Sequence, residues 1–172
     1  MINNLKTVFI TISIASLLYI YCSVPQRVLP QEDMPASELN DPASETKILV
    51  ASRYSEYKEA VIEKFKNAFT DQPVYIKVIG LEDLENENAK QYNAIIMINK
   101  CMAWNLDRNV VDFLKHNENH DKMIVFTTSG DGNWQPKMEG RNFDTISSAS
   151  EMAAVDQVAN QLIEKVNSRI PG

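Results

Sequence analysis

Residues 123–134, MIVFTTSGDGNW, decide how the rest of the chain is interpreted. The first half, residues 123–128, is a short apolar run rich in β-branched and aromatic side chains, which is typical of a strand buried on both faces. The run passes directly into the polar turn 129–132, which holds two of the chain's five glycines. Open α/β sheets bind their ligands where buried parallel strands end in such loops. The stretch therefore predicts a parallel sheet with a ligand site at the carboxyl ends of its strands.

Similar apolar runs predict the other strands of this sheet. They lie at residues 47–51, 74–79 and 92–99, and a weaker run follows at 143–147. Apolar residues spaced three or four apart predict amphipathic helices over 56–69 and around 106–114, with a short helical turn in the acidic stretch 80–91. Ser148 and Glu151 have the spacing of a capping box, which predicts a last helix from there to about residue 169.

Strands that alternate with helices define the predicted fold class. They favour an α/β domain over residues 47–170, in which a parallel sheet is covered by helices on both faces in three layers. One connection departs from this pattern. Residues 133–142 contain Pro136 and Gly140 and have no helical period, so we expect a coil connection into a short fifth strand.

Composition and motifs exclude several classes of function. The chain has 172 residues and a formal net charge of −6, and its Lys and Arg residues are scattered. Without a basic cluster it lacks the electrostatic signature of nucleic-acid binding. No metal site is predicted from its two cysteines or from His116 and His120, which polar residues separate. Motifs of serine hydrolases, zinc proteases and P-loop proteins are absent, so the sequence names no catalytic residue.

Residues 1–24 predict a membrane segment. Residues 7–24 form an apolar run of about 18 residues, just long enough to cross a bilayer core. Tyr19 and Tyr21 stand where a signal-peptide cleavage site, or a lipoprotein motif at Cys22, requires other residues. An uncleaved anchor is therefore favoured, with a cleaved signal and a lipoprotein left open. The positive charge before the run favours a domain on the outer side of the membrane, periplasmic or extracellular.

Residues 25–46 predict a disordered linker between this segment and the domain. They contain four prolines and five acidic residues but almost no large apolar side chains. Such a stretch buries too little surface to offset the entropy of ordering it, and repeated proline keeps it extended. We expect it to act as a spacer.

The globular part resembles the flavodoxin-like family over residues 47–169. The likeness rests on KILVASRYSEYKEAV at 47–61, YNAIIMINKCMAW at 92–104, VFTTSGDGNW at 125–134 and NFDTISSASEM at 142–152. The resemblance implies a strand order of 2-1-3-4-5 and a ligand crevice at the ends of the first, third and fourth strands. It also implies FMN as the cofactor and electron transfer as the role.

The loop after the first strand departs from the family pattern. Flavodoxins have a T-x-T-G-N-T-like run there, whose hydroxyls, glycine and amides surround the FMN phosphate at a helix N-terminus. In this chain Ser52 and Ser55 offer hydroxyls and Arg53 offers a positive charge. No glycine lets the backbone curl around a dianion, and Glu56 would repel one. The resemblance therefore supports the fold better than the cofactor.

The predicted cofactor-binding residues all lie in loops that follow strands, or at the strand ends. Trp104 has the position of the aromatic ring that flavodoxin-like proteins stack on the flavin, although packing over a helix is the simpler interpretation. Trp134 is likewise interpreted as a cap on the sheet edge, the two glycines as turn glycines with unusual backbone angles, and Asp131 as a turn former. The set is Ser52, Arg53, Ser55, Asn99, Trp104, Ser129, Gly130, Asp131, Gly132 and Trp134.

Two functional hypotheses follow from the sequence. The first is a membrane-tethered, non-catalytic module that has lost tight FMN binding and binds a protein partner outside the cytoplasm. The alternative is a tethered electron-transfer protein, or a flavin-dependent oxidoreductase, that holds FMN through a divergent loop. The hypotheses differ in whether residues 52–56 supply donors to a phosphate.

Overall fold

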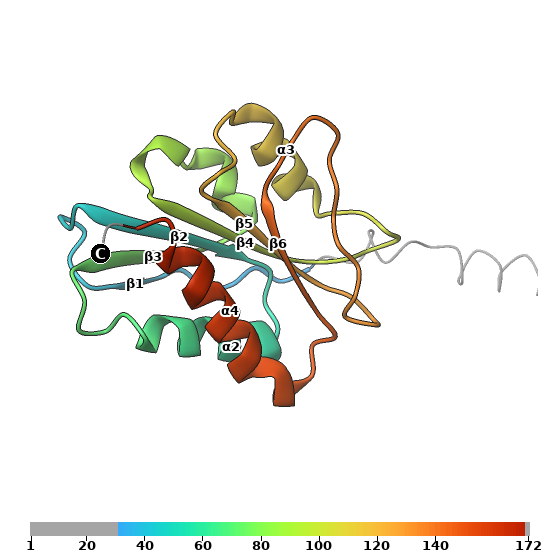
Figure 1. Ribbon diagram of the computed structural model, residues 1–172, viewed down its shortest axis with the longest axis horizontal. Helices are drawn as coiled ribbons and strands as arrows, with labels where there is room; N and C mark the ends of the chain where they lie inside the picture. The colour runs from blue at the N-terminus through green and yellow to red at the C-terminus, as the bar shows by residue number, and fades with distance from the viewer. Residues whose placement is uncertain (1–30, 171–172) are drawn as a thin grey trace, which may run out of the picture. The chain divides into compact units, whose positions relative to one another are not determined.

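The structure is a computed structural model that describes residues 31–170 (Figure 1). Its strands alternate with helices after a short additional strand at the start. The elements are β1 (Ser37–Leu39), β2 (Thr46–Ser52), α2 (Glu56–Asn67), β3 (Val74–Gly80), the 3-10 helices η2 (Glu82–Asn86) and η3 (Ala89–Gln91), β4 (Ala94–Lys100), α3 (Arg108–His116), β5 (Met123–Thr128), β6 (Asp144–Ser148), the 3-10 helix η4 (Met152–Ala154) and α4 (Val155–Asn167). The strands predicted from the apolar runs are confirmed to within two residues at each end.

One six-stranded sheet organises the domain, in the order β1-β3-β2-β4-β5-β6. All neighbours from β3 to β6 are parallel, and β1 pairs antiparallel with β3. If β1 is set aside, the parallel strands have the order 2-1-3-4-5 in chain sequence, which is the flavodoxin-like order. The fold is therefore flavodoxin-like, as the resemblance implied, and β1 is an addition to it.

Helices cover both faces of the sheet, α2 and α4 on one and α3 with η2 on the other (Figure 1). Successive side chains of a strand point to opposite faces, so each central strand supplies both cores. In β4, Ile96 and Ile98 pack on the side of α2, whereas Ile95 and Met97 pack on the side of α3. Burial on both faces explains why these strands are continuous apolar runs rather than alternating ones.

The prediction of a disordered linker is wrong for residues 31–46, the part of the linker that the structure describes. Residues from Gln31 onward belong to one compact unit with the rest of the domain. Met34 is 6% exposed and lies in the core beneath α2. β1 adds a three-residue ladder to β3, and Asn40, with a left-handed φ of 64°, donates through its side-chain amide to the carbonyls of Phe69, Gln72 and Val74. Residues 25–30 lie outside the described part of the chain.

Two local predictions at the C-terminal half have different outcomes. The coil connection between β5 and β6 is confirmed, with a tight turn closed by a bridge between Met138 and Arg141. The capping box is wrong, because Ser148 is the last residue of β6 and its hydroxyl bonds to that of Tyr57 at 2.7 Å. The helix instead begins at Val155 after η4, with no side-chain cap.

The predicted membrane segment, residues 1–24, lies outside the described residues. Within residues 31–170, none of the helices has the length and apolar character needed to span a bilayer.

Candidate functional site

The topology brings the predicted residues to one edge of the sheet, the carboxyl edge, where the parallel strands β2, β4 and β5 end. Because β2 is followed by a helix on one face and β4 by a helix on the other, the chain's switch point lies between these two strands. This is the place where doubly wound sheets hold ligands. Strand alternation puts Ser52 on the α2 side, and Arg53 and Asn99 on the α3 side.

Arg53 is held inside the protein by three carboxylates. It is 8% exposed. Its Nη1 lies 2.7 Å from Asp33 and 2.9 Å from Glu82, and its Nε lies 3.0 Å from Asp107. Burial alone would lower the pKa of Arg53, but Asp107, Glu82 and Asp33 raise it on balance. The prediction that this guanidinium is available to neutralise a phosphate is therefore wrong for this conformation.

The two loop serines also have partners within the protein. Ser52 is fully buried and its hydroxyl donates to the carbonyl of Arg53 at 2.8 Å. Ser55 is the N-cap of α2, and its hydroxyl accepts from the amide of Lys58 at 3.3 Å. The amide of Tyr54 donates to the carbonyl of Glu32 at 2.8 Å. The Ser52 hydroxyl and the Tyr54 amide therefore donate within the protein, whereas the Ser55 hydroxyl only accepts and keeps its O–H donor.

Asn99 forms part of a polar row across three strands. It pairs with Thr127 in β5, which in turn pairs with Ser147 in β6. The Asn99 side chain is fully buried and donates to Thr127 Oγ1 at 3.1 Å and to the carbonyl of Phe126 at 3.2 Å. Within the described residues, Asn99 Oδ1 and Ser147 Oγ are buried without a partner. Such groups usually bind an ordered water.

Trp104 stands at the tip of a strained turn. Met102 and Asn105 exchange two backbone hydrogen bonds, and between them Ala103 and Trp104 have left-handed φ values of 49° and 60°. Two consecutive left-handed residues other than glycine are costly and often mark functional sites. The Trp104 side chain is 75% exposed, so the prediction that it packs over a helix is wrong.

The loop after β5 is a hydrogen-bonded turn. Asp131 accepts from the Ser129 hydroxyl at 3.2 Å and from the Asn133 amide at 3.1 Å. The Asn133 amide, followed by the Ser129 hydroxyl, holds the pKa of Asp131 below its ordinary value. Gly132 has a φ of 70° and passes so near Ala149 that a Cβ would lie 2.7 Å from the Ala149 nitrogen. Asp131 is thus confirmed as a turn former.

Gly130 and Trp134 were also predicted to belong to the site in this loop, and their outcomes differ from those of Gly132 and Asp131. Gly130 does not have a left-handed φ, and a Cβ there would meet no atom within 4 Å, so the predicted need for glycine is wrong at this position. Trp134 is half-buried, and its role stays a prediction.

Lys58 is a residue that the sequence analysis missed. It lies on the first turn of α2, on the same buried face as Val61, Ile62 and Phe65, and is only 3% exposed. Among residues 31–170 its ammonium group has no hydrogen bond or ion pair. Burial, and secondarily the charge of Lys100, lower its pKa to about 8. The signal available in the sequence was the spacing: Lys58 lies three, four and seven residues before Val61, Ile62 and Phe65, which places it on the apolar face of the helix.

These contacts determine how well the carboxyl edge fits FMN. A tightly bound phosphate needs free amides and hydroxyls in a loop that curls around it. Here the donors of Ser52, Arg53 and Tyr54 are engaged elsewhere, and only the O–H of Ser55 is not. Lys58 and the exposed Lys100 offer positive charges that have no ion pair among the described residues. The loop as it stands therefore does not fit a tightly held phosphate.

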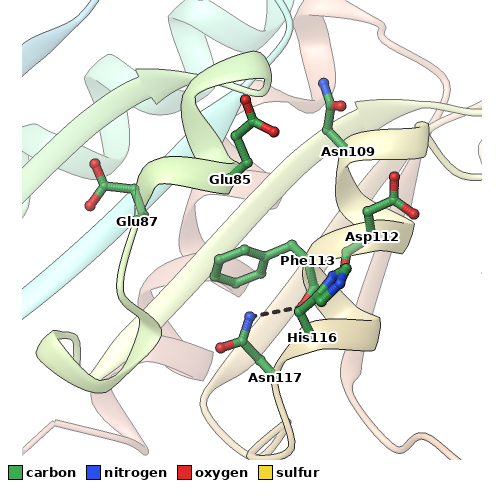
Figure 2. Close-up of a pocket in the computed structure, with 7 residues that line it drawn as sticks. All are labelled: Glu85, Glu87, Asn109, Asp112, Phe113, His116 and Asn117. Carbon is green, nitrogen blue, oxygen red and sulfur yellow. Dashed lines mark hydrogen bonds between the residues drawn. The ribbon is translucent and has the colours of Figure 1, made fainter.

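A separate pocket of about 460 Å³ lies between η2 and α3 (Figure 2). Its floor is the ring of Phe113, and Asn117 closes one side by donating to the Phe113 carbonyl at 2.8 Å. Glu87 on its wall is already paired with Lys77 at 2.7 Å. No predicted site residue lines this pocket. Its lining consists of Glu85, Glu87, Asn109, Asp112, Phe113, His116 and Asn117.

Comparison with known proteins gives structural likenesses only. No family model and no curated protein matches the chain. Similar solved structures include a flavodoxin from the domain Archaea, with 15% identity and a TM-score of 0.45 over 71% of this chain and 99% of the other. Oxidised flavodoxin 2 from Bacillus cereus has 14% identity and a TM-score of 0.45 over 73% of this chain and 100% of the other.

A metal-soaked flavodiiron core from Synechocystis sp. PCC6803 has 10% identity and a TM-score of 0.45 over 73% of this chain. The chain spans only 37% of the length of that protein. The fold assignment rests on the strand order and helix placement described above. Nothing about the ligand of this chain follows from these likenesses.

Proposed function

We propose that this protein is a flavodoxin-like binding module that has lost tight FMN binding and is tethered to a membrane by its N-terminal segment. Its partner is a protein on the outer side of that membrane, and its contact surface is the carboxyl edge with the exposed Trp104 turn. Membrane tethering is supported by the apolar run at residues 7–24.

The observation that carries the proposal is the engagement of the loop after β2. Arg53 is bonded to Asp33, Glu82 and Asp107, and the Tyr54 amide is bonded to Glu32. A phosphate that used the Arg53 guanidinium or the Tyr54 amide would first have to break these contacts. The free energy needed to break existing contacts reduces the net binding free energy and so weakens the affinity. FMN is therefore expected to bind weakly or not at all.

The alternative function, an FMN-binding electron carrier, is favoured by two specific observations. Lys58 is a buried cation without a partner among the described residues, which suits an anionic ligand at the start of α2. Trp104 is exposed next to the switch point, where it would be free to stack on a planar ring. If bound, FMN would supply reversible electron transfer. The chain's own residues would orient it and shield it from water.

An absorption spectrum of the purified full-length chain tests the proposal. The protein is incubated with excess FMN and desalted, and the flavin band of the retained ligand is recorded. Lys58→Met serves as the matched variant, because it keeps the apolar stem and removes the charge. The proposal expects no retained flavin in either protein.

Two results would overturn the proposal in favour of the alternative. Flavin retained by the natural chain and lost in the Lys58→Met variant would assign Lys58 to the ligand. Flavin retained by both proteins would show that FMN binds tightly without this charge.

A further inference from the structure

Residues 31–34, here called the strap, cross the carboxyl edge of the sheet before the chain enters β1. The amide of Met34 donates to the carbonyl of Ser52 at 3.0 Å, and the carbonyl of Glu32 accepts from Tyr54 at 2.8 Å. Asp33 pairs with Arg53 as an isolated antiparallel bridge. The strap therefore extends β2 beyond its end as an added antiparallel strand.

The Asp33 side chain anchors the strap to two strands at once. Its Oδ1 accepts from Arg53 Nη1 at 2.7 Å and from the Leu81 amide at 3.1 Å, and its Oδ2 accepts from the Glu82 amide at 3.0 Å. The last residue of β3, Gly80, makes room for it. A Cβ at Gly80 would lie 2.6 Å from the Cβ, Cγ and Oδ2 of Asp33. A substitution at Gly80 would therefore push the strap away from the sheet.

The strap occupies groups that would attract an anion. Arg53 carries one positive charge and faces three carboxylates, so the net charge of the four side chains is −2. Removal of the Asp33 carboxylate changes the net charge to −1. The side chain of Glu82 is 71% exposed and is free to turn towards water. Release of the strap would also free the Tyr54 amide. Lys58 and Lys100 lie on the α2 side of the same edge and add positive charge there.

We propose that the strap is an autoinhibitory element that excludes phosphate monoesters from the carboxyl edge, and that its release creates a site for them. The proposal rests on the proposed function, because it gives the reason why tight FMN binding is lost. The strap continues directly into residues 1–30. A partner that binds the carboxyl edge, which the strap crosses, is therefore placed to release it.

The test uses the full-length chain with two independent ways to release the strap. Asp33→Ala removes the anchoring carboxylate, and Gly80→Ala forces the strap away by contact. Glu32→Ala is the matched control, because Glu32 is an exposed acid of the same strap whose backbone carbonyl, not its side chain, bonds to the Tyr54 amide. Amide hydrogen exchange at Met34 and Tyr54 reports the position of the strap. Titrations with FMN and riboflavin report binding with and without a phosphate.

In Asp33→Ala and Gly80→Ala, both amides should exchange faster and FMN should bind about tenfold more tightly or better, since donors are freed in both variants and Asp33→Ala also removes a negative charge. Riboflavin affinity should not change, and Glu32→Ala should match the natural chain. Faster exchange without tighter FMN binding would refute autoinhibition and leave the loss of FMN binding intact. Unchanged exchange in both variants would show that the strap is not releasable by these contacts. Tight FMN binding by the natural chain would instead refute the proposed function.

Discussion

The replacement Met34→Ala tests whether the segment before β1 belongs to the folded domain. Met34 is 6% exposed and packs in the core on the α2 side of the sheet. Truncation of a buried methionine to alanine costs about 2–5 kcal/mol, and sites that can collapse lie at the low end. Since Met34 enters the core from a terminal segment, we expect a loss of about 2–3 kcal/mol in the free energy of unfolding.

The assay is urea denaturation of the full-length chain, followed by far-UV circular dichroism. With a slope of about 2 kcal/mol per molar urea, the midpoint should fall by about 1 M. Met152→Ala is the matched control, because Met152 is 60% exposed. Its effect should stay within about 0.5 kcal/mol of zero. Equal urea midpoints for the two variants would refute the reasoning and support the prediction that the segment before β1 is a disordered linker.

Three further predictions concern stability. Ala103→Gly should raise the free energy of unfolding by about 1 kcal/mol in urea titrations, because glycine adopts the left-handed φ of 49° without strain. Asn40→Ala should lower it by about 2 kcal/mol, and by more than Asn40→Gly, since alanine loses the amide contacts and also strains the φ of 64°. The pKa of Lys58 is lowered to about 8 from 10.5, so the unfolded chain binds more protons between these values and stability should rise with pH there. Lys58→Met should abolish this rise and raise the free energy of unfolding at pH 7 by about 3 kcal/mol, which is the free energy equivalent to the lowering of the Lys58 pKa. Thermal unfolding measured as a function of pH checks both effects.

The parallel sheet could be predicted from the sequence because its strands are buried on both faces. A strand such as β4 is then a run of apolar residues with sharp ends, and little else in a chain has that appearance. β1 could not be predicted in this way. It has three residues, Ser37, Glu38 and Leu39, and only one of them is apolar. It is held by its ladder with β3, which no local pattern records.

The candidate site was predicted in position but not in chemistry. Ser52, Asn99 and Gly132 lie at the carboxyl edge because strand order alone places them there. What Arg53 binds depends on Asp33 and Asp107, which are 20 and 54 residues away in the chain. Side-chain partners at such separations are set by the tertiary structure, so one sequence without relatives does not show them.

The missing glycine in the loop after β2 has a physical explanation in the strap. A loop that curls around a phosphate needs a residue that tolerates unusual backbone angles. Here residues 52–54 pair with residues 32–34 as an antiparallel strand, and extended backbone is open to any side chain. The close approach that requires glycine has moved to Gly80, which pairs with Ser52 and faces Asp33. The glycine-free loop and the acidic segment before β1 are thus two parts of one arrangement, and a flavodoxin-like chain with both should also have a small residue at the end of its second parallel strand.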